Sequence, residues 1–420
     1  MTHRFQIVLI AGVVGAGVLL AALVGMWAYM MATPPLHPNP GNVPTVARAG
    51  TPEEWSAAAG RGRQVVLAGL VEQSLPGVSV AVGAGGEIVW AEGFGFADLD
   101  SRAPVSPRTR FRIGTASRVL TSAAVGLLIE RDRLALDETI QTYVPEFPAK
   151  PWPVTLRQLM GHTAGVRNDG GDEGPYAEHC GRTIEGLELF KDQTLLFEPG
   201  TRQRDSNYGW ILVSAAVEAA AREPFTRFMR REIFEPLGMA DTRPDSASEN
   251  ISNSATFYFP RFAAEPRYGY HLMRPIDLSC YAGAGVFLST PSDLVRFAMA
   301  VNGGTLLKPS TVERLQTPER LASGEETGYG LGWDRGTAVI AGAGTRWTGH
   351  DGRVLGGPVT ALLTFPERDL SVAVTSNIPY AQVEAMAVAV AQAFSRSTPG
   401  ASRRTPAAAS AAPESIPARR

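Results

Sequence analysis

The side chains that could perform acid–base, nucleophilic or metal chemistry are few and scattered along the 420-residue chain. It contains six histidines and two cysteines, Cys180 and Cys280. Only His179 and Cys180 bring two metal-ligand types together, and adjacent ligands do not have the spacing of a zinc site. His350 and Asp351 are also adjacent, but neighbours on a strand face opposite ways, so we do not expect them to form a proton relay. We expect neither a metal ion nor a cofactor.

Seven short motifs follow one another between about residues 76 and 377. They are residues 111–118 (FRIGTASR), 154–165 (VTLRQLMGHTAG), 197–200 (FEPG), 206–210 (SNYGW), 236–239 (PLGM), 329–333 (YGLGW) and 349–352 (GHDG). In this order and at these spacings they resemble the β-lactamase-related serine hydrolases. That family includes class C β-lactamases, D-alanyl-D-alanine carboxypeptidases, esterases and the mitochondrial serine β-lactamase-like protein.

The resemblance implies a site in three parts. A Ser-x-x-Lys motif opens a buried helix, where the serine attacks a carbonyl and the lysine helps to take its proton. A Tyr-x-Asn motif adds a tyrosine base and an asparagine that orients the substrate, and a Lys-Thr-Gly or His-x-Gly motif lines the neighbouring strand. This chemistry requires a nucleophile with a base in hydrogen-bond reach. The helix N-terminus adds a positive dipole and free N–H groups.

Three of the family's main catalytic positions carry other residues here. The nucleophile falls on Thr115, the lysine on Arg118 and the tyrosine on Asp205. Arginine has a pKa above roughly 12 and cannot act as a base near neutral pH. Threonine adds a methyl group at a crowded position, and Thr115 could equally be a helix N-cap. We expect Arg118 and Asp205 to form an ion pair beside Thr115, which would lower the pKa of Asp205.

The other family positions are retained. Ser206 and Asn207 complete an Asp-Ser-Asn motif, and His350 and Gly352 fit His-x-Gly. The resemblance implies that Asn207 and His350 belong to the catalytic set, and that Ser206 and Gly352 contact the substrate. His162 lies in a turn motif of the family, so we expect it to be structural.

The substitutions favour a degenerate member of the family, which keeps the fold and pocket but hydrolyses its ligand very slowly or not at all. Such a protein would bind a peptide-like or cell-wall-derived ligand, or a protein partner. Two alternatives stay open: an active hydrolase of amides or esters with Thr115 as nucleophile and Asp205 as base, and a membrane-tethered scaffold without a ligand. A formal net charge of −2 and the lack of a basic stripe argue against nucleic-acid binding.

The elements that must position these residues indicate an α+β fold. Alternating small and apolar residues predict a hairpin of residues 78–82 and 87–96, and a second hairpin of residues 359–365 and 370–375. Helices are expected over residues 53–71, 117–130, 211–221, 224–234 and 380–394. Hairpins near both chain ends around a helical middle predict one antiparallel sheet built from both ends. Helices flank this sheet, and a helical subdomain is inserted, as the resemblance to β-lactamases and penicillin-binding proteins also implies.

The N-terminal segment predicts a membrane anchor. Residues 5–31 carry no charge, and about 20 apolar residues suffice to cross a bilayer. Trp27 and Tyr29 stand near the outer end, where aromatic rings favour the interface. Arg4 precedes the stretch and the next basic residue is Arg48, which places the N-terminus in the cytoplasm and the domain outside. A cleaved signal peptide is the alternative, although the segment lacks a good small-residue cleavage site.

The expected organisation follows from these segments. The only two cysteines, Cys180 and Cys280, lie in an exported domain, so we predict a disulfide between them, with two buried thiols as the alternative. The expected parts are a cytoplasmic tip (1–4), a transmembrane anchor (5–31), a proline-rich linker acting as an extended spacer (32–50), the β-lactamase-related domain (51–394) and a disordered tail (395–420).

Overall fold

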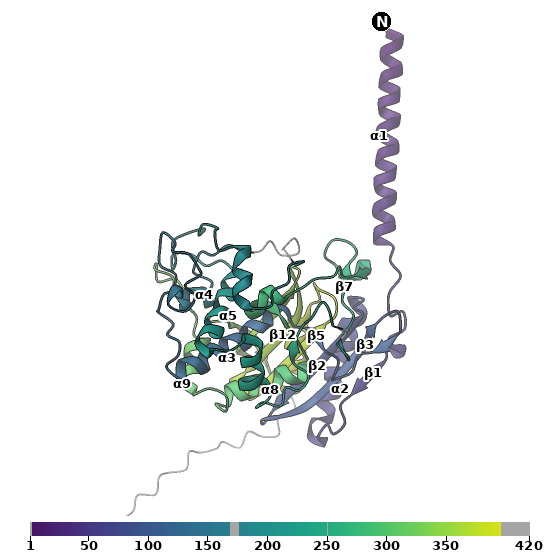
Figure 1. The fold of residues 1–420 in the computed structure, drawn as a ribbon. Coiled ribbons are helices and arrows are strands. Elements are labelled where there is room, and N and C mark those ends of the chain that lie inside the picture. Colours follow the sequence, from purple (N-terminus) through teal and green to yellow (C-terminus); the bar gives the residue numbers. More distant parts are fainter. Residues whose placement is uncertain (1, 169–175, 250, 396–420) are drawn as a thin grey trace, which may run out of the picture.

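One antiparallel sheet organises the protein in a computed structural model that describes residues 2–168, 176–249 and 251–395 (Figure 1). Its described strands run in the order β1-β3-β2-β13-β12-β11-β10, with β4 beside β3. Their bounds are β1 Thr45–Ala47, β2 Gly77–Ala84, β3 Glu87–Asp98, β4 Ala103–Pro104, β10 Asp334–Ile340, β11 Ala343–Val354, β12 Gly357–Phe365 and β13 Leu370–Ser376. The two chain ends meet in mid-sheet, where Val80 pairs with Val374.

Helices cover both faces of this sheet. The main ones are α2 (Glu53–Glu72), α3 (Ser117–Glu130), α5 (Asn207–Ala221), α8 (Pro291–Asn302) and α10 (Val383–Ser395). Val78, Val80 and Val82 of β2 share a core with α2 and α10. Ala81 faces the other way and joins a second core with α3, α5 and α8, as the period of two in a strand requires. The predicted α+β fold is confirmed, including the sheet from both chain ends and the inserted helical region.

The remaining helices and strands are short, and along the chain they all fall between β4 and β10. They are α4 (Leu156–Met160), α6 (Phe225–Met229), α7 (Ala282–Gly285), α9 (Pro309–Gln316), β5 (Phe111–Arg112), β6 (Arg243–Pro244), β7 (Tyr258–Pro260), β8 (Tyr270–Leu272) and β9 (Phe287–Ser289). Two helices differ from the prediction. The helix expected over residues 224–234 turns π-helical at Arg230. Helix α5 begins at Asn207, before the expected Ile211, because the Ser206 hydroxyl accepts a hydrogen bond from the Gly209 N–H and caps it.

The proline-rich segment differs from the extended spacer that its composition predicted. Residues 45–47 form β1, in which Val46 pairs with Gly93 of β3. The side chain of His37 is buried, and its Nε2 lies 2.8 Å from the Leu75 carbonyl oxygen. Burial also lowers the pKa of His37. Apolar and hydrogen-bonding groups within this segment therefore attach it to the domain instead of holding the domain at a distance.

Helix α1 (Thr2–Met31) projects from the domain, and its lower end lies beside the β7–β8 hairpin (Figure 1). Within the described residues it is the one helix long and apolar enough to cross a membrane, with a mean hydropathy of 1.9 over Gly12–Tyr29. A signal sequence near an N-terminus would meet the same criteria. The predicted disordered tail lies outside the described residues, apart from Ser395, which ends α10.

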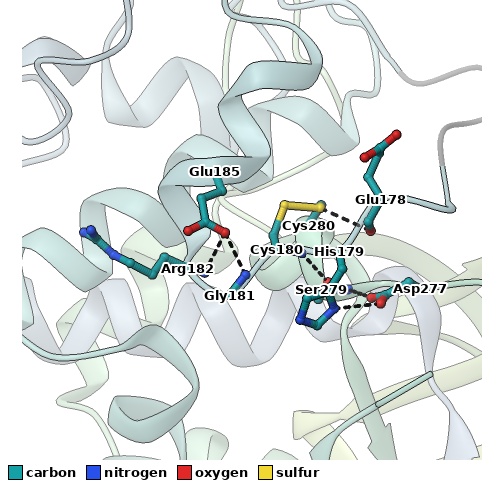
Figure 2. Close-up of a disulfide and its surroundings, with 9 residues drawn as sticks. All are labelled: Glu178, His179, Cys180, Gly181, Arg182, Glu185, Asp277, Ser279 and Cys280. Atoms are coloured by element: carbon teal, nitrogen blue, oxygen red, sulfur yellow. Dashed lines mark hydrogen bonds and ion pairs between the residues drawn. A yellow bond between two sulfur atoms is a disulfide. The ribbon is translucent and has the colours of Figure 1, made fainter. Parts of the chain in front are cut away.

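A disulfide joins Cys180 to Cys280, as predicted, with the two Cα atoms 4.9 Å apart (Figure 2). Around it, the Cys180 N–H donates to the Ser279 hydroxyl (2.9 Å), and His179 Nδ1 lies 2.8 Å from a carboxylate oxygen of Asp277. The bridge thus connects the segment before the 3₁₀ helix Thr183–Leu189 to the segment before α7.

Candidate active site

A cleft of about 510 Å³ lies where the start of α3, the start of α5 and the end of β11 come together. It brings together five of the residues that the sequence predicted for the catalytic set: Thr115, Arg118, Asp205, Asn207 and His350. Its lining also includes Asn168, Tyr176, Gln203, Arg204, His162, Tyr329, Asp334, Asp351, Arg353, Leu355 and Gly356.

Thr115 is hydrogen-bonded to the main chain of β11. Its hydroxyl donates to the Asp351 carbonyl oxygen (3.1 Å) and accepts from the Arg353 N–H (2.9 Å). The close approach requires Gly114, whose φ is +54° and where a Cβ would lie 2.1 Å from the Arg353 oxygen. Thr115 is not the N-cap of α3, because Ala116 occupies that position. The hydroxyl hydrogen is therefore directed at a carbonyl and not at a base.

Arg118 and Asp205 form the ion pair that the sequence predicted. Two bonds join the guanidinium to the carboxylate, from Nη1 to Oδ2 (2.6 Å) and from Nη2 to Oδ1 (3.2 Å). Nη2 also donates to Asn207 Oδ1 (2.6 Å). The Arg118 side chain is only 2% exposed, whereas that of Asp205 is 57% exposed. The buried cation is thus held by a carboxylate that stands at the wall of the cleft.

Burial and charge act against one another in this pair. Burial disfavours the charged form of Arg118, but the charge and hydrogen bonds of Asp205, together with Tyr329, outweigh burial and raise the pKa of the guanidinium. Burial would raise the pKa of Asp205, but the charge and hydrogen bonds of Arg118, together with the nearby histidines, outweigh burial and hold that pKa well below its usual range. Solvent reaches the exposed carboxylate and screens part of this attraction. Both groups stay charged at neutral pH.

His162 lies at the base of the cleft, behind the ion pair. Its Nδ1 accepts from the Ser206 N–H (3.2 Å), and its Nε2 lies 3.3 Å from Asp205 Oδ2. Two donors, Arg118 Nη1 (3.1 Å) and Trp210 Nε1 (3.4 Å), also meet Nε2, so donors face both ring nitrogens. Burial, opposed by Asp205 and reinforced by the charge of Arg118, lowers the pKa of His162 to about 3. The side chain supports the residues around it, which agrees with the structural role predicted for it.

His350 shares an acceptor, the Asp351 carbonyl oxygen, with Thr115. Its Nδ1 meets the Asp351 carbonyl oxygen, which can only accept, so Nδ1 carries the proton and Nε2 accepts from the Tyr329 hydroxyl (3.1 Å). Burial raises the pKa of Tyr329 well above its ordinary value. His350 and Asp351 both line the cleft, although we expected them to face opposite ways. The pairing of β11 with β12 is irregular just beyond them, after Gly352.

None of the four described side chains of the cleft whose pKa is shifted is suited to act as a general base. Such a base works best with a pKa near the operating pH. The pKa values of Arg118 and Tyr329 are raised and those of Asp205 and His162 are lowered, all away from neutrality. Both nitrogens of His350 already have partners. What the arrangement offers instead is a fixed polar wall of charges, carboxamides and hydroxyl groups.

Two predicted substrate-binding residues do not line the cleft. Ser206 is buried, and its hydroxyl donates to the Arg167 carbonyl oxygen (2.7 Å) while capping α5. A Cβ on Gly352 would lie 2.0 Å from the Ile113 oxygen, so this glycine allows β11 to pass close to the chain before α3. Asn207 does line the cleft. Substrate contact by Ser206 and Gly352 stays a prediction.

Sequence reasoning overlooked Tyr329, Asp334 and Arg353 as members of the site. Each stands in or directly beside a motif that was recognised, and this adjacency was the available signal. Asp334, His350 and Asp351 place metal-ligand atoms within 4.8 Å of one another. However, Asp334 already accepts from the Asp351 N–H (3.3 Å), and the Asp351 carboxylate accepts from Arg353 Nε (2.8 Å). We therefore assign no metal there.

The order of these elements matches a known family over most of the chain. The Beta-lactamase family model matches residues 62–394, from α2 to α10. The chain belongs to this family. It is 28% identical over 408 residues to the serine beta-lactamase-like protein LACTB, mitochondrial, from Mus musculus, covering 73% of this chain and 72% of that protein. It is 26% identical over 272 residues to penicillin-binding protein 4* from Bacillus subtilis, covering 61% and 58%.

Solved structures share the Beta-lactamase-family fold. A D-amino acid amidase from Ochrobactrum anthropi, complexed with L-phenylalanine amide, superposes with a TM-score of 0.66 at 23% identity, covering 82% of this chain and 99% of the amidase. An octameric penicillin-binding protein homologue from Pyrococcus abyssi superposes with a TM-score of 0.65 at 23% identity, covering 78% and 75%. At this level of identity, these similarities show the fold and not the activity.

Proposed function

We propose that this protein is a membrane-anchored member of the Beta-lactamase family whose degenerate site binds a ligand with little or no turnover. The observation that carries the proposal is the bonding of Thr115. Its hydroxyl donates to one β11 main-chain group and accepts from another. The family's lysine position holds Arg118, which stays cationic and is paired with Asp205. A nucleophile needs a base within hydrogen-bond reach, and in the described part of the chain no such base faces this hydroxyl.

A peptide-like compound is the ligand class that best fits the cleft. Its lining offers carboxamides at Gln203 and Asn207, a cation at Arg204 and an anion at Asp334. Such a mixture can bind the amide groups and both charged ends of a short peptide. One relative is named a penicillin-binding protein, and we extend the proposed ligand class to peptides derived from the cell wall. A protein partner that presents a peptide end would use the same groups.

Acylation assays test the proposal directly. The full-length protein is incubated with a fluorescent β-lactam and, separately, with an activated ester. We expect little labelling or hydrolysis by the wild type or by Thr115→Ser, because that change restores no base. The triple variant Thr115→Ser, Arg118→Lys, Asp205→Tyr should become measurably acylated. Thr337→Ser, at an exposed position of β10, serves as the matched threonine control and should stay unreactive.

The alternatives predict other outcomes. Substantial turnover by the wild type that Thr115→Ala abolishes would overturn the degenerate-site proposal and establish a threonine nucleophile. Binding is measured separately, by calorimetry with a peptide that ends in D-alanyl-D-alanine. We expect Asn207→Ala to weaken this binding, because the carboxamide lines the cleft. Failure of such peptides, and of other peptide ends, to bind would favour a scaffold without a ligand.

A further inference from the structure

The β7–β8 surface, defined here as residues 258–274, is aromatic and basic and lies beside the lower end of α1 (Figure 1). It contains five tyrosine or phenylalanine residues, three arginines and one glutamate. Outside α1, the large apolar side chains of the described residues are rarely exposed, yet β8 exposes Tyr270 (38%) and Leu272 (67%). Exposed aromatic and apolar groups among cations are typical of segments at a membrane surface.

Contacts tie this surface to the chain that leaves α1. The Thr33 hydroxyl donates to the Tyr268 carbonyl oxygen (3.0 Å) and accepts from Arg261 Nη2 (2.8 Å). The Arg261 guanidinium also lies 5.8 Å from the centroid of the Tyr29 ring, near the end of α1. Gly269 has a φ of +93°, and a Cβ there would lie 3.1 Å from the methyl group of Thr33. The turn of the hairpin thus accommodates the exit of the helix.

These contacts fix the height of the hairpin relative to any membrane that α1 crosses. The helix has 30 residues and ends at Met31. At 1.5 Å per residue it is about 45 Å long, close to the roughly 40–45 Å of a bilayer with its headgroups. The two residues from Met31 to Thr33 span at most about 7 Å. The hairpin, which is held to Thr33, therefore lies at the level of the outer headgroups.

We propose that the β7–β8 surface contacts the outer headgroup layer of the membrane that α1 crosses, and that this contact fixes the orientation of the domain. The inference rests on the membrane anchoring of the proposed function. The arginines match the negative charge of anionic lipids, and the exposed rings and Leu272 match the boundary with the acyl chains. No other described segment combines these features with a direct link to α1.

The contact has a consequence for the cleft. Leu355 lines both the cleft and an apolar hollow of about 500 Å³ formed with Phe259, Phe262 and Met273 of the hairpin region. The mouth of the cleft therefore adjoins the β7–β8 surface. A domain resting on this surface presents its cleft close to the membrane, where ligands attached to the bilayer are concentrated.

Lipid-resolved fluorescence quenching tests the proposal. The full-length protein is reconstituted in vesicles of phosphatidylcholine and phosphatidylserine, with an environment-sensitive fluorophore on Leu272→Cys, since the native cysteines are bridged. The matched control is Val339→Cys, at a position 60% exposed. Val339 pairs with Gly344 near the start of β11, at the far end of that strand from Leu355. We expect lipids spin-labelled at the headgroup to quench the fluorophore at position 272 several-fold more than the one at position 339.

Flotation and alkaline extraction of the same samples separate the two proposals. Protein that does not float with the vesicles overturns the anchoring and, with it, this inference. Protein that stays anchored but shows equal quenching at both positions overturns the inference alone. The inference is also wrong if the fluorophore at position 272 is shielded from both the spin-labelled lipids and aqueous iodide, because a second protein surface then covers it.

Discussion

The two partners of the Arg118–Asp205 pair differ in how far their side chains are exposed to solvent. This difference decides what each residue contributes to stability. The guanidinium is 2% exposed and the carboxylate 57% exposed. A buried cation without its partner is costly, whereas an exposed carboxylate without its partner returns to water. Asp205 is therefore needed mainly to neutralise Arg118, and Arg118 occupies the place where the family's lysine would work as a base.

Asp205→Asn should destabilise the protein more than Arg118→Met. Removing one partner of a fully buried ion pair costs about 3–5 kcal/mol. Because water reaches the site of Asp205, we expect Asp205→Asn to lower the free energy of unfolding by about 1–3 kcal/mol. Arg118→Met fills the space and leaves a hydrated carboxylate, so its loss should be smaller. Thermal unfolding in detergent measures both. The control is Asp137→Asn, whose carboxylate is 76% exposed in its pair with Arg157; equal losses for the two aspartates would contradict the argument.

His162 should make the protein sensitive to acid. In the folded state its pKa is about 3, because the ring is buried beside Arg118, while in the unfolded chain it is about 6.5. Between these values the unfolded state binds more protons, so stability is present above pH 6.5 and falls as the pH falls. The slope from this group should approach about 1.4 kcal/mol per pH unit between pH 5.5 and 4. His162→Gln should flatten the profile, and an unchanged slope would argue against a neutral buried ring.

For the individual residues, the sequence predicted which of them lie together in the cleft, but not every hydrogen bond that they make. The Arg118–Asp205 pair followed from two substitutions of opposite charge at positions that the family resemblance places together. The bonding of Thr115 to Asp351 and Arg353 could not be predicted, because it depends on how closely β11 approaches a segment more than two hundred residues earlier. The site role of Tyr329 was missed for the same reason, since burial of its hydroxyl is a tertiary property.

Among the elements, the disulfide connects a segment beside the cleft to a segment beside a smaller adjoining hollow. Cys180 follows Tyr176, which lines the cleft, and Cys280 precedes Tyr281, which lines a smaller adjoining hollow. The Asp277 N–H also donates to the Tyr176 carbonyl oxygen (2.7 Å). These segments contain little regular secondary structure of their own, so the covalent link compensates for hydrogen bonds that a sheet or a long helix would supply.

Removing this bridge should lower stability substantially. The cysteines are 100 residues apart, and closing so long a loop contributes about 4–5 kcal/mol in the chain-entropy model. The double variant Cys180→Ala, Cys280→Ala should therefore unfold at a lower temperature and lose its response to reductant. The wild type in reductant should match it. A wild type whose unfolding temperature does not respond to complete reduction, verified by thiol counting, would contradict the prediction.

Regular elements were predictable where their pattern is local. The hairpins near both ends and the helix Ser117–Glu130 match the prediction because alternation and continuous apolar character are local signals. The linker was misjudged because five prolines suggested an extended spacer. The structure uses that extended backbone as an edge strand, in which Val46 pairs with Gly93. Which exposed sheet edge a short extended segment joins cannot be read from composition.

In the whole molecule, helix α1, the β7–β8 hairpin and the cleft lie next to one another in that order. Helix α1 ends close to Thr33, Thr33 is bonded to the β7–β8 turn, and the hollow beside that hairpin shares Leu355 with the cleft. The cleft is therefore positioned relative to α1 by the fold itself. Under the proposed membrane anchoring, the topology of α1 decides on which side of the membrane a ligand must be.

We expect an N-terminus in the cytoplasm and a domain outside it. Arg4 precedes the apolar helix, and no Lys or Arg follows until Arg48; basic residues are retained on the cytoplasmic side. A reporter fused after Phe394 should be active only outside the cytoplasm, and protease added to intact cells should digest the domain.

The protein should resist alkaline extraction and keep its N-terminal peptide in mass spectrometry. A mature chain that begins near Thr33 would identify a cleaved signal peptide, and cytoplasmic reporter activity would reverse the orientation. Either result would also remove the basis for holding the cleft at a membrane surface, since that arrangement requires α1 to stay attached and the domain to lie outside.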